Sequence, residues 1–193
     1  WIFTDWLKKF HPKPDIRHNQ FEIEAVRLFS PELTMEKNTM YIGRLCDLFT
    51  SKNRRVICVH NNDLLLLETQ ELEEVLNCVL DALAFYTSWD NSMMNLLTSG
   101  AMLQDLMNTS ARVLEYPAFI LDSGQRHLAH TPGYKRGEVD ELWDNLVELG
   151  TCDLNFLVRF NQFDPQRFNK KGIYSYDSSI FPNPAYHYNF LQG

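Results

Sequence analysis

The chain contains no pair of cysteines at the spacing of a zinc knuckle or a redox dithiol. Its four cysteines are Cys46, Cys58, Cys78 and Cys152, and none forms a Cys-x-x-Cys pair. A reduced compartment therefore fits the chain better than a secreted disulfide framework. The sequence also contains no Gly-rich phosphate loop, no Gly-x-Ser-x-Gly elbow and no His-Glu-x-x-His string, so these catalytic motifs are excluded.

Long apolar runs and excess positive charge are missing as well. No apolar stretch approaches the roughly 20 residues that span a bilayer, and no signal peptide is visible, which predicts a cytoplasmic protein without membrane contact. The 193 residues carry a net charge of -7, and an acidic surface repels the phosphate backbone of nucleic acids. Because the chain begins with Trp1 rather than Met, we expect it to be a piece of a longer protein.

The chain does contain short strand patterns that alternate with amphipathic helical patterns, which predicts an α+β fold. Hydrophobic residues make up 45% of the sequence, an ordinary fraction for a globular protein. A chain of this length buries roughly 70% of its unfolded surface, so its core needs neither a disulfide nor a metal. The patterns divide the chain into three parts, at residues 1–68, 69–116 and 117–193.

Residues 1–68 are predicted to form a small strand-rich α/β unit. A short helical pattern over residues 1–10 is stopped by Pro12 and Pro14, because proline restricts the residue before it and lacks a donor. Asn61-Asn62 separates two apolar runs and predicts a hairpin turn, since asparagine tolerates the left-handed region. The strands expected in this unit lie at residues 21–29, 40–45, 55–60 and 63–68.

Residues 69–116 are predicted to be a helical connector. Apolar residues recur at three- and four-residue spacing from Leu72 to Leu97, which predicts one helix of roughly 27–30 residues that ends or bends at Gly100. A second helix is expected at residues 102–114. The long helix exceeds the average of about 11–12 residues, so its stripe either packs against the N-terminal unit or forms a dimer interface. The interface candidates are Tyr86, Trp89, Met93, Met94 and Leu97.

Residues 117–193 are predicted to form a hairpin–helix–sheet unit. Two strand patterns flank Ser123-Gly124, and a helical pattern from Glu138 to Leu149 is followed by Gly150 as its cap. The remaining segments are a strand or a helix at residues 153–160, a long loop at 161–184 and a last strand at 186–191.

The middle of the chain, from about Tyr41 to Gly133, resembles the bacterial regulator family that includes PucR and CdaR, the purine-catabolism and sugar-diacid regulators. Pro117–Asp122 is similar to the first strand of a GAF- or PAS-like sensor module. The segments that carry the rest of the resemblance are Tyr41-Ile42-Gly43, Val56–His60 with Asp63, Tyr86 with Trp89-Asp90, and Leu103–Leu106. These are distributed hydrophobic signatures rather than a catalytic string.

The resemblance implies a sensor and dimerisation region that precedes a helix-turn-helix. No basic helix-turn-helix pattern occurs in this chain, so DNA contacts are expected only through a region outside it. The GAF/PAS-like unit is expected to be incomplete, because it stops at Gly193 before the final strands that the resemblance implies. We therefore expect a homodimeric, non-enzymatic input region for a small-molecule effector. The alternatives are a small intracellular hydrolase and an interaction module without a ligand.

Six large side chains of the last unit are candidates for the wall of an effector pocket, because ligand sites are mostly apolar. This assignment follows the fold analogy alone, and an ordinary sheet–helix core is the alternative for each residue. The six are Phe119, Leu121, Leu128, Tyr134, Trp143 and Phe156.

Histidine and cysteine side chains suggest two further sites, which the sequence disfavours. His127 and His130 are three residues apart, and on a strand such a pair faces opposite sides, so we expect no metal site and no cofactor. Cys58 and His60 suggest a nucleophile and its base for the hydrolase alternative, but nothing in the sequence marks an oxyanion hole. A packed thiol and a turn histidine are the simpler interpretation.

Overall fold

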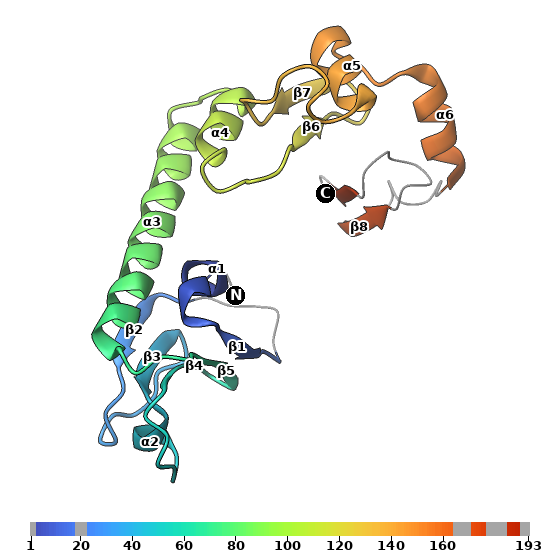
Figure 1. The fold of residues 1–193 in the computed structure, drawn as a ribbon. Coiled ribbons are helices and arrows are strands. Elements are labelled where there is room, and N and C mark those ends of the chain that lie inside the picture. The colour runs from blue at the N-terminus through green and yellow to red at the C-terminus, as the bar shows by residue number, and fades with distance from the viewer. Residues whose placement is uncertain (1–2, 18–22, 164–170, 177–184, 190–193) are drawn as a thin grey trace. The chain divides into compact units, whose positions relative to one another are not determined.

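The computed structural model describes residues 3–17, 23–163, 171–176 and 185–189, which form the α+β fold that the sequence predicts (Figure 1). Internal contacts divide the chain into two compact units, Trp1–Asp90 and Asn91–Gly193. The boundary falls inside the segment that the sequence marks as a connector. Among the helices of the described ranges, none is both long and apolar enough to cross a bilayer.

The first unit is built on a five-stranded sheet with the strand order β1-β5-β4-β3-β2. Every neighbouring pair is antiparallel except β2 and β3, which run parallel. The hairpin turn between β4 and β5 is confirmed, and Asn61 adopts the left-handed conformation with φ 53°. The elements before the long helix are α1 (Phe3–Trp6), η1 (Lys8–Phe10), β1 (Lys13–Asp15), β2 (Ala25–Leu28), β3 (Thr39–Arg44), α2 (Leu45–Leu48), β4 (Val56–His60) and β5 (Asp63–Leu66).

One face of this sheet packs against α1 and the first turns of α3 (Leu72–Thr98) (Figure 1). The buried residues of α3 are Val75, Val79 and Ala82. Full burial of a valine side chain stabilises the fold by about 1.5–3 kcal/mol, so this short stretch attaches the helix to the unit. The other buried residues of the same core are Phe3, Leu7, Phe10, Met40, Ile42, Val56, Cys58, Leu65 and Leu67.

The opposite face of β3 is closed by the segment that follows β2 and by α2. Tyr41 is buried there, and its hydroxyl accepts the amide hydrogen of Glu36 at 2.9 Å. A Cβ atom on Gly43 would lie 2.9 Å from both Phe29 Cβ and Leu48 Cδ1. Glycine at this position therefore permits a close approach that any side chain would obstruct.

The long helix is confirmed, because α3 runs through 27 residues without a break. No glycine or proline occurs between Leu72 and Thr98, so nothing in this segment interrupts the helical hydrogen bonds. The helix ends before Gly100, which has φ 72°, and the amide of Ala101 donates to the carbonyl of Leu96 at 3.0 Å. This is the left-handed termination that glycine favours.

In its described residues, the second unit combines three further helices with two separate two-stranded antiparallel sheets. Its buried core contains Leu142, Leu146, Cys152 and Phe156. The elements after α3 are α4 (Leu103–Ser110), β6 (Phe119–Leu121), β7 (His127–His130), α5 (Glu141–Leu149), α6 (Leu154–Phe163), β8 (Gly172–Tyr176) and β9 (Ala185–Asn189).

In this unit one prediction is wrong, one helix is confirmed with an earlier end, and one ambiguous segment is resolved. The segment 161–184, predicted as a loop, contains the end of α6 and strand β8, and the helix expected at 102–114 ends at Ser110. The ambiguous segment at 153–160 is helical, because the Asp153 carboxylate accepts two amide hydrogens of its first turn. In the first unit, β2 occupies only part of the strand predicted at 21–29, whose first two residues lie outside the described ranges.

Candidate functional site: a histidine pair beside Trp143

The hairpin of β6 and β7 contains an irregular register. Phe119 pairs with His130 and Leu121 pairs with His127, so two steps along β6 match three steps along β7. The extra residue is Leu128, which forms a β-bulge. Because side chains alternate along a regular strand, this one additional residue places His127 and His130 on the same side of the hairpin.

The prediction that these histidines face opposite sides is therefore wrong. His130 Nδ1 lies 3.1 Å from His127 Nε2, and the ring centroids are 5.0 Å apart. In the neutral pair one ring nitrogen donates its hydrogen to the other. Burial, and then electrostatic repulsion from His130, lower the pKa of His127 from its ordinary value of 6.5.

The backbone beneath both rings is fixed by groups from outside the hairpin. Gln104 of α4 donates through Nε2 to the His130 carbonyl at 2.8 Å, and its Oε1 accepts the His130 amide hydrogen at 3.1 Å. The His127 amide donates to the carbonyl of Gly150 at 2.9 Å. The side-chain amide of Gln104 thus replaces one residue of a neighbouring strand. The sequence showed Gln104 only as part of a helical segment, and no signal there marks this role.

The indole of Trp143 packs against the His130 ring of the pair. Trp143 is only 3% exposed, and its ring meets the His130 ring edge to face at 5.7 Å. The rings of Tyr134 and Phe119 lie 5.5 and 6.1 Å from it. The Trp143 amide donates to the Asp140 carboxylate at 2.8 Å at the start of α5. This cap fixes the turn that carries the indole.

The structure brings together five of the six residues predicted to line a pocket. Phe119 and Tyr134 contact Trp143, and Phe119 and Leu121 pack against the core cluster that contains Phe156. Trp143 and Phe156 are buried, whereas Phe119, Leu121 and Tyr134 are half-buried. Leu128 is the exception, because it is the bulge residue and is 44% exposed.

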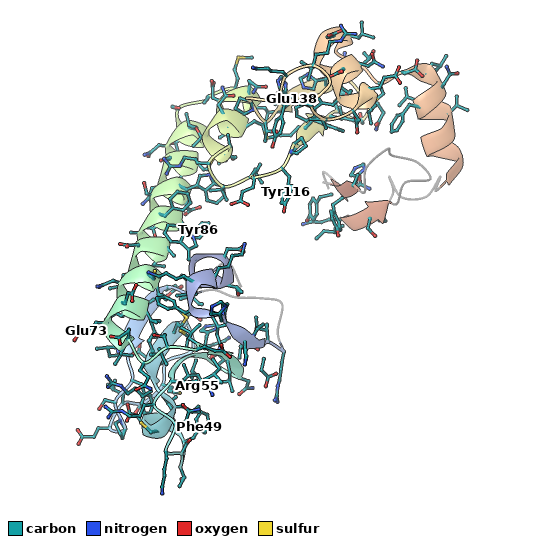
Figure 2. All side chains as sticks on the ribbon, viewed as in Figure 1. Phe49, Arg55, Glu73, Tyr86, Tyr116 and Glu138 are labelled. Carbon is teal, nitrogen blue, oxygen red and sulfur yellow. The ribbon has the colours of Figure 1, made fainter. Side chains whose placement is uncertain are left out.

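The predicted interface residues lie on α3 beyond its buried stretch. Tyr86, near the middle of the helix (Figure 2), is half-buried, as are Trp89 and Met93, whose Sδ accepts the Ser110 hydroxyl at 3.5 Å. Met94 and Leu97 are 52% and 56% exposed. The apolar stripe of the helix therefore continues past the residues that the first unit buries.

The residues of the hydrolase alternative do not form an activated nucleophile. Burial raises the pKa of the Cys58 thiol to about 12, so the thiol stays protonated at neutral pH, whereas the thiolate is the nucleophilic form. Burial also lowers the pKa of His60. Across the turn from His60, the Asp63 carboxylate accepts the amide hydrogen of Arg17 at 2.6 Å. This contact links the end of the hairpin to the chain after β1.

Within the described ranges, no group of three or more His, Cys, Asp or Glu side chains is placed to hold a metal ion. The histidine pair is therefore a two-ligand arrangement as far as these residues are concerned. Comparisons of the chain with protein-family models, curated proteins and solved structures found no match.

Proposed function

We propose that this chain is the signal-input region of a bacterial transcription regulator of the PucR/CdaR kind, combining a sensor with a dimerisation helix. The DNA contacts come from a region outside this chain, and the effector is a small molecule. The proposal assigns no catalytic step to the chain. It extends the sequence resemblance, and one structural observation supports it.

That observation is the exposed apolar surface on the second half of α3. Burial in the helix is confined to Val75, Val79 and Ala82, whereas Met94 and Leu97 are more than half exposed. Methionine and other large apolar residues are enriched at protein interfaces, and a continuous exposed apolar patch usually marks one.

The partner that fits this surface is a second copy of the chain. Closed two-fold dimers are the commonest homo-oligomers, and a dimeric input region matches the two half-sites that helix-turn-helix dimers recognise. A helix of 27 residues offers a long surface for such pairing, because it extends roughly 40 Å.

Sedimentation at micromolar concentration tests the dimer. The chain of 22.7 kDa is expected to sediment as a dimer, and the double variant Met94→Lys, Leu97→Lys as a folded monomer. Leu149→Lys is the matched control, since Leu149 is 69% exposed on α5, and it should stay dimeric. A wild-type monomer, or a dimer that the α3 charges leave intact, would refute the dimerisation part.

A thermal-shift screen tests the sensor part. Purines and sugar diacids form the first panel, because the resemblance is to regulators of those compounds. A ligand that binds only the folded state raises the midpoint of unfolding, and the rise grows with the ratio of its concentration to its Kd. No stabilisation by any member of the panel, with the dimer intact, favours the interaction module without a ligand.

A further inference from the structure

We propose that His127 and His130 form a chelating site for one divalent transition-metal ion of the Zn²⁺, Ni²⁺ or Cu²⁺ type. The two imidazoles supply two nitrogen ligands, and the remaining coordination positions are filled by water or a small donor molecule. The site does not depend on the proposed regulatory function.

The separation of the two ring nitrogens carries the geometric argument. With metal–nitrogen bonds of about 2.0–2.1 Å, two ligands lie about 3.3–3.4 Å apart in tetrahedral geometry and about 2.9 Å apart at a right angle. The Nδ1 of His130 and the Nε2 of His127 are 3.1 Å apart, between these values. An ion bonded to both nitrogens lies off the line that joins them, so each imidazole turns by roughly 40° from its hydrogen-bonded orientation. The hydrogen between the rings then moves to the outer nitrogen of its own ring.

The surroundings hold the backbone of both ligands before any ion arrives. Gln104 fixes the backbone of His130 through two hydrogen bonds, Gly150 fixes that of His127, and the edge of Trp143 restrains the His130 ring. Ligands that are already oriented lose less conformational entropy on binding. Mutation of residues that orient metal-binding histidines without contacting the metal commonly lowers metal affinity by about 10–100-fold.

The ligand chemistry of the site selects the kind of ion. Imidazole nitrogen suits zinc, copper and nickel, whereas calcium and magnesium prefer oxygen ligands. The site should accordingly discriminate against Mg²⁺ and Ca²⁺.

Calorimetric titration of the tag-free, chelator-treated chain with Ni²⁺ and Zn²⁺ tests the proposal. One ion per chain is expected. Replacing either ligand should weaken binding on the order of a hundredfold, because the second bond of a chelate forms at high effective concentration. His127→Gln and His130→Asn keep a polar atom near the lost nitrogen. His11→Asn is the matched control, since His11 is exposed and has φ 47°, a conformation that asparagine tolerates.

A fluorescence measurement gives a second readout. Cu²⁺ held by His130 would lie beside Trp143, whose ring centroid is 5.7 Å from that imidazole, so binding should quench the indole emission. The quenching should decrease in Trp143→Phe and occur only at higher Cu²⁺ concentration in Gln104→Leu, which releases the His130 backbone. Circular dichroism confirms that each variant is folded.

The proposal is wrong if the folded His127→Gln and His130→Asn variants bind Ni²⁺ as tightly as the parent chain. It is equally wrong if the parent shows no saturable binding below millimolar metal, or if Cu²⁺ quenching is the same in Gln104→Leu. Because neither measurement depends on the oligomeric state, failure of the dimer experiment leaves this result interpretable.

Discussion

Gly43 shows how a single residue can be required by the packing of two elements around it. Its neighbours on the closed face are Phe29 and Leu48, each 2.9 Å from the place a Cβ would occupy. The Phe29 atom is itself a Cβ and moves only with its backbone, whereas the Leu48 atom is the end of a flexible side chain. Two obstacles of different stiffness therefore exclude a side chain here.

We predict that Gly43→Ala lowers the free energy of unfolding by about 1–3 kcal/mol, the usual effect of overpacking, as measured by urea denaturation. The double variant with Leu48→Ala removes one of the two obstacles. Its loss of unfolding free energy should therefore be smaller than the sum of the losses in the two single variants. Strict additivity, or a stabilised Gly43→Ala, would show that the β3 backbone moves freely away from Phe29.

Two histidines with lowered pKa values predict how stability depends on pH. Burial lowers the pKa of His60 and of His127 below the ordinary 6.5, so the unfolded state takes up protons first as the pH falls. Stability is then fully present above pH 6.5 and is lost below it. The shifted carboxyl groups Glu68 and Asp122 have ordinary pKa values of 4.5 and 3.8, so they act at lower pH.

Denaturation series between about pH 7 and pH 5.5 measure this effect, because buried neutral histidines destabilise the fold when they must take up a proton. The unfolding free energy should decrease as the pH is lowered in the unsubstituted chain, and it should decrease less steeply in His60→Gln and His127→Gln. Stability that is constant or rises over this interval would contradict the assignment.

At the residue scale, the sequence named side chains without their contacts. Phe119, Tyr134 and Trp143 were predicted to line an effector pocket; their rings lie near one another, and the pocket itself stays a prediction. The histidine pair was missed because the alternation rule assumes a regular strand, and the bulge depends on the pairing of β7 with β6. Gln104 was missed because it bonds to the backbone amide and carbonyl of His130, which lies 26 residues away in the sequence.

At the scale of elements, strong periodicity and short turns were readable. The stripe from Leu72 to Leu97 predicted α3, and Asn61-Asn62 predicted the first hairpin. Strand β8 was missed because it forms by pairing with β9, and polar residues surround it in sequence. Helix α6 could have been recognised from Asp153, whose carboxylate caps its first turn.

The uneven burial of α3 leads to a prediction for neighbouring positions. Val79→Ala should destabilise the fold by about 1–3 kcal/mol, because it leaves a cavity in the core of the first unit. Leu80→Ala, at a position 41% exposed, should change stability by about 0.5 kcal/mol or less. Thermal and urea denaturation provide the comparison. Equal losses for the two variants would show that α3 is buried on both sides at this point.

At the scale of the whole molecule, the division into two units could not be read from the sequence. The boundary at Asp90 and Asn91 lies inside α3, where the chain has no glycine, proline or change of composition. A domain boundary is usually found in an exposed linker, and here the helix replaces one. The sequence instead placed divisions at residues 68 and 116, on either side of the helical segment.

The net charge of -7 leads to a prediction for the whole chain. Because nonspecific DNA binding depends on neutralising phosphates with lysine and arginine, we expect no shift of random duplex DNA in gel electrophoresis at about 50 mM salt. In the proposed regulator, the DNA contacts come from a region outside this chain. Salt-sensitive binding by this chain alone would require a basic surface that the average charge conceals.

The bulge at Leu128 makes the loss of this residue differ from its replacement. Its side chain is 44% exposed and takes no part in the contact between the histidine rings, so a substitution there leaves the pair in place. The number of residues, however, cannot change. Loss of one codon would restore regular alternation and turn one imidazole to the other side of the hairpin. Within this strand, a deletion has a consequence that no substitution at the same position shares.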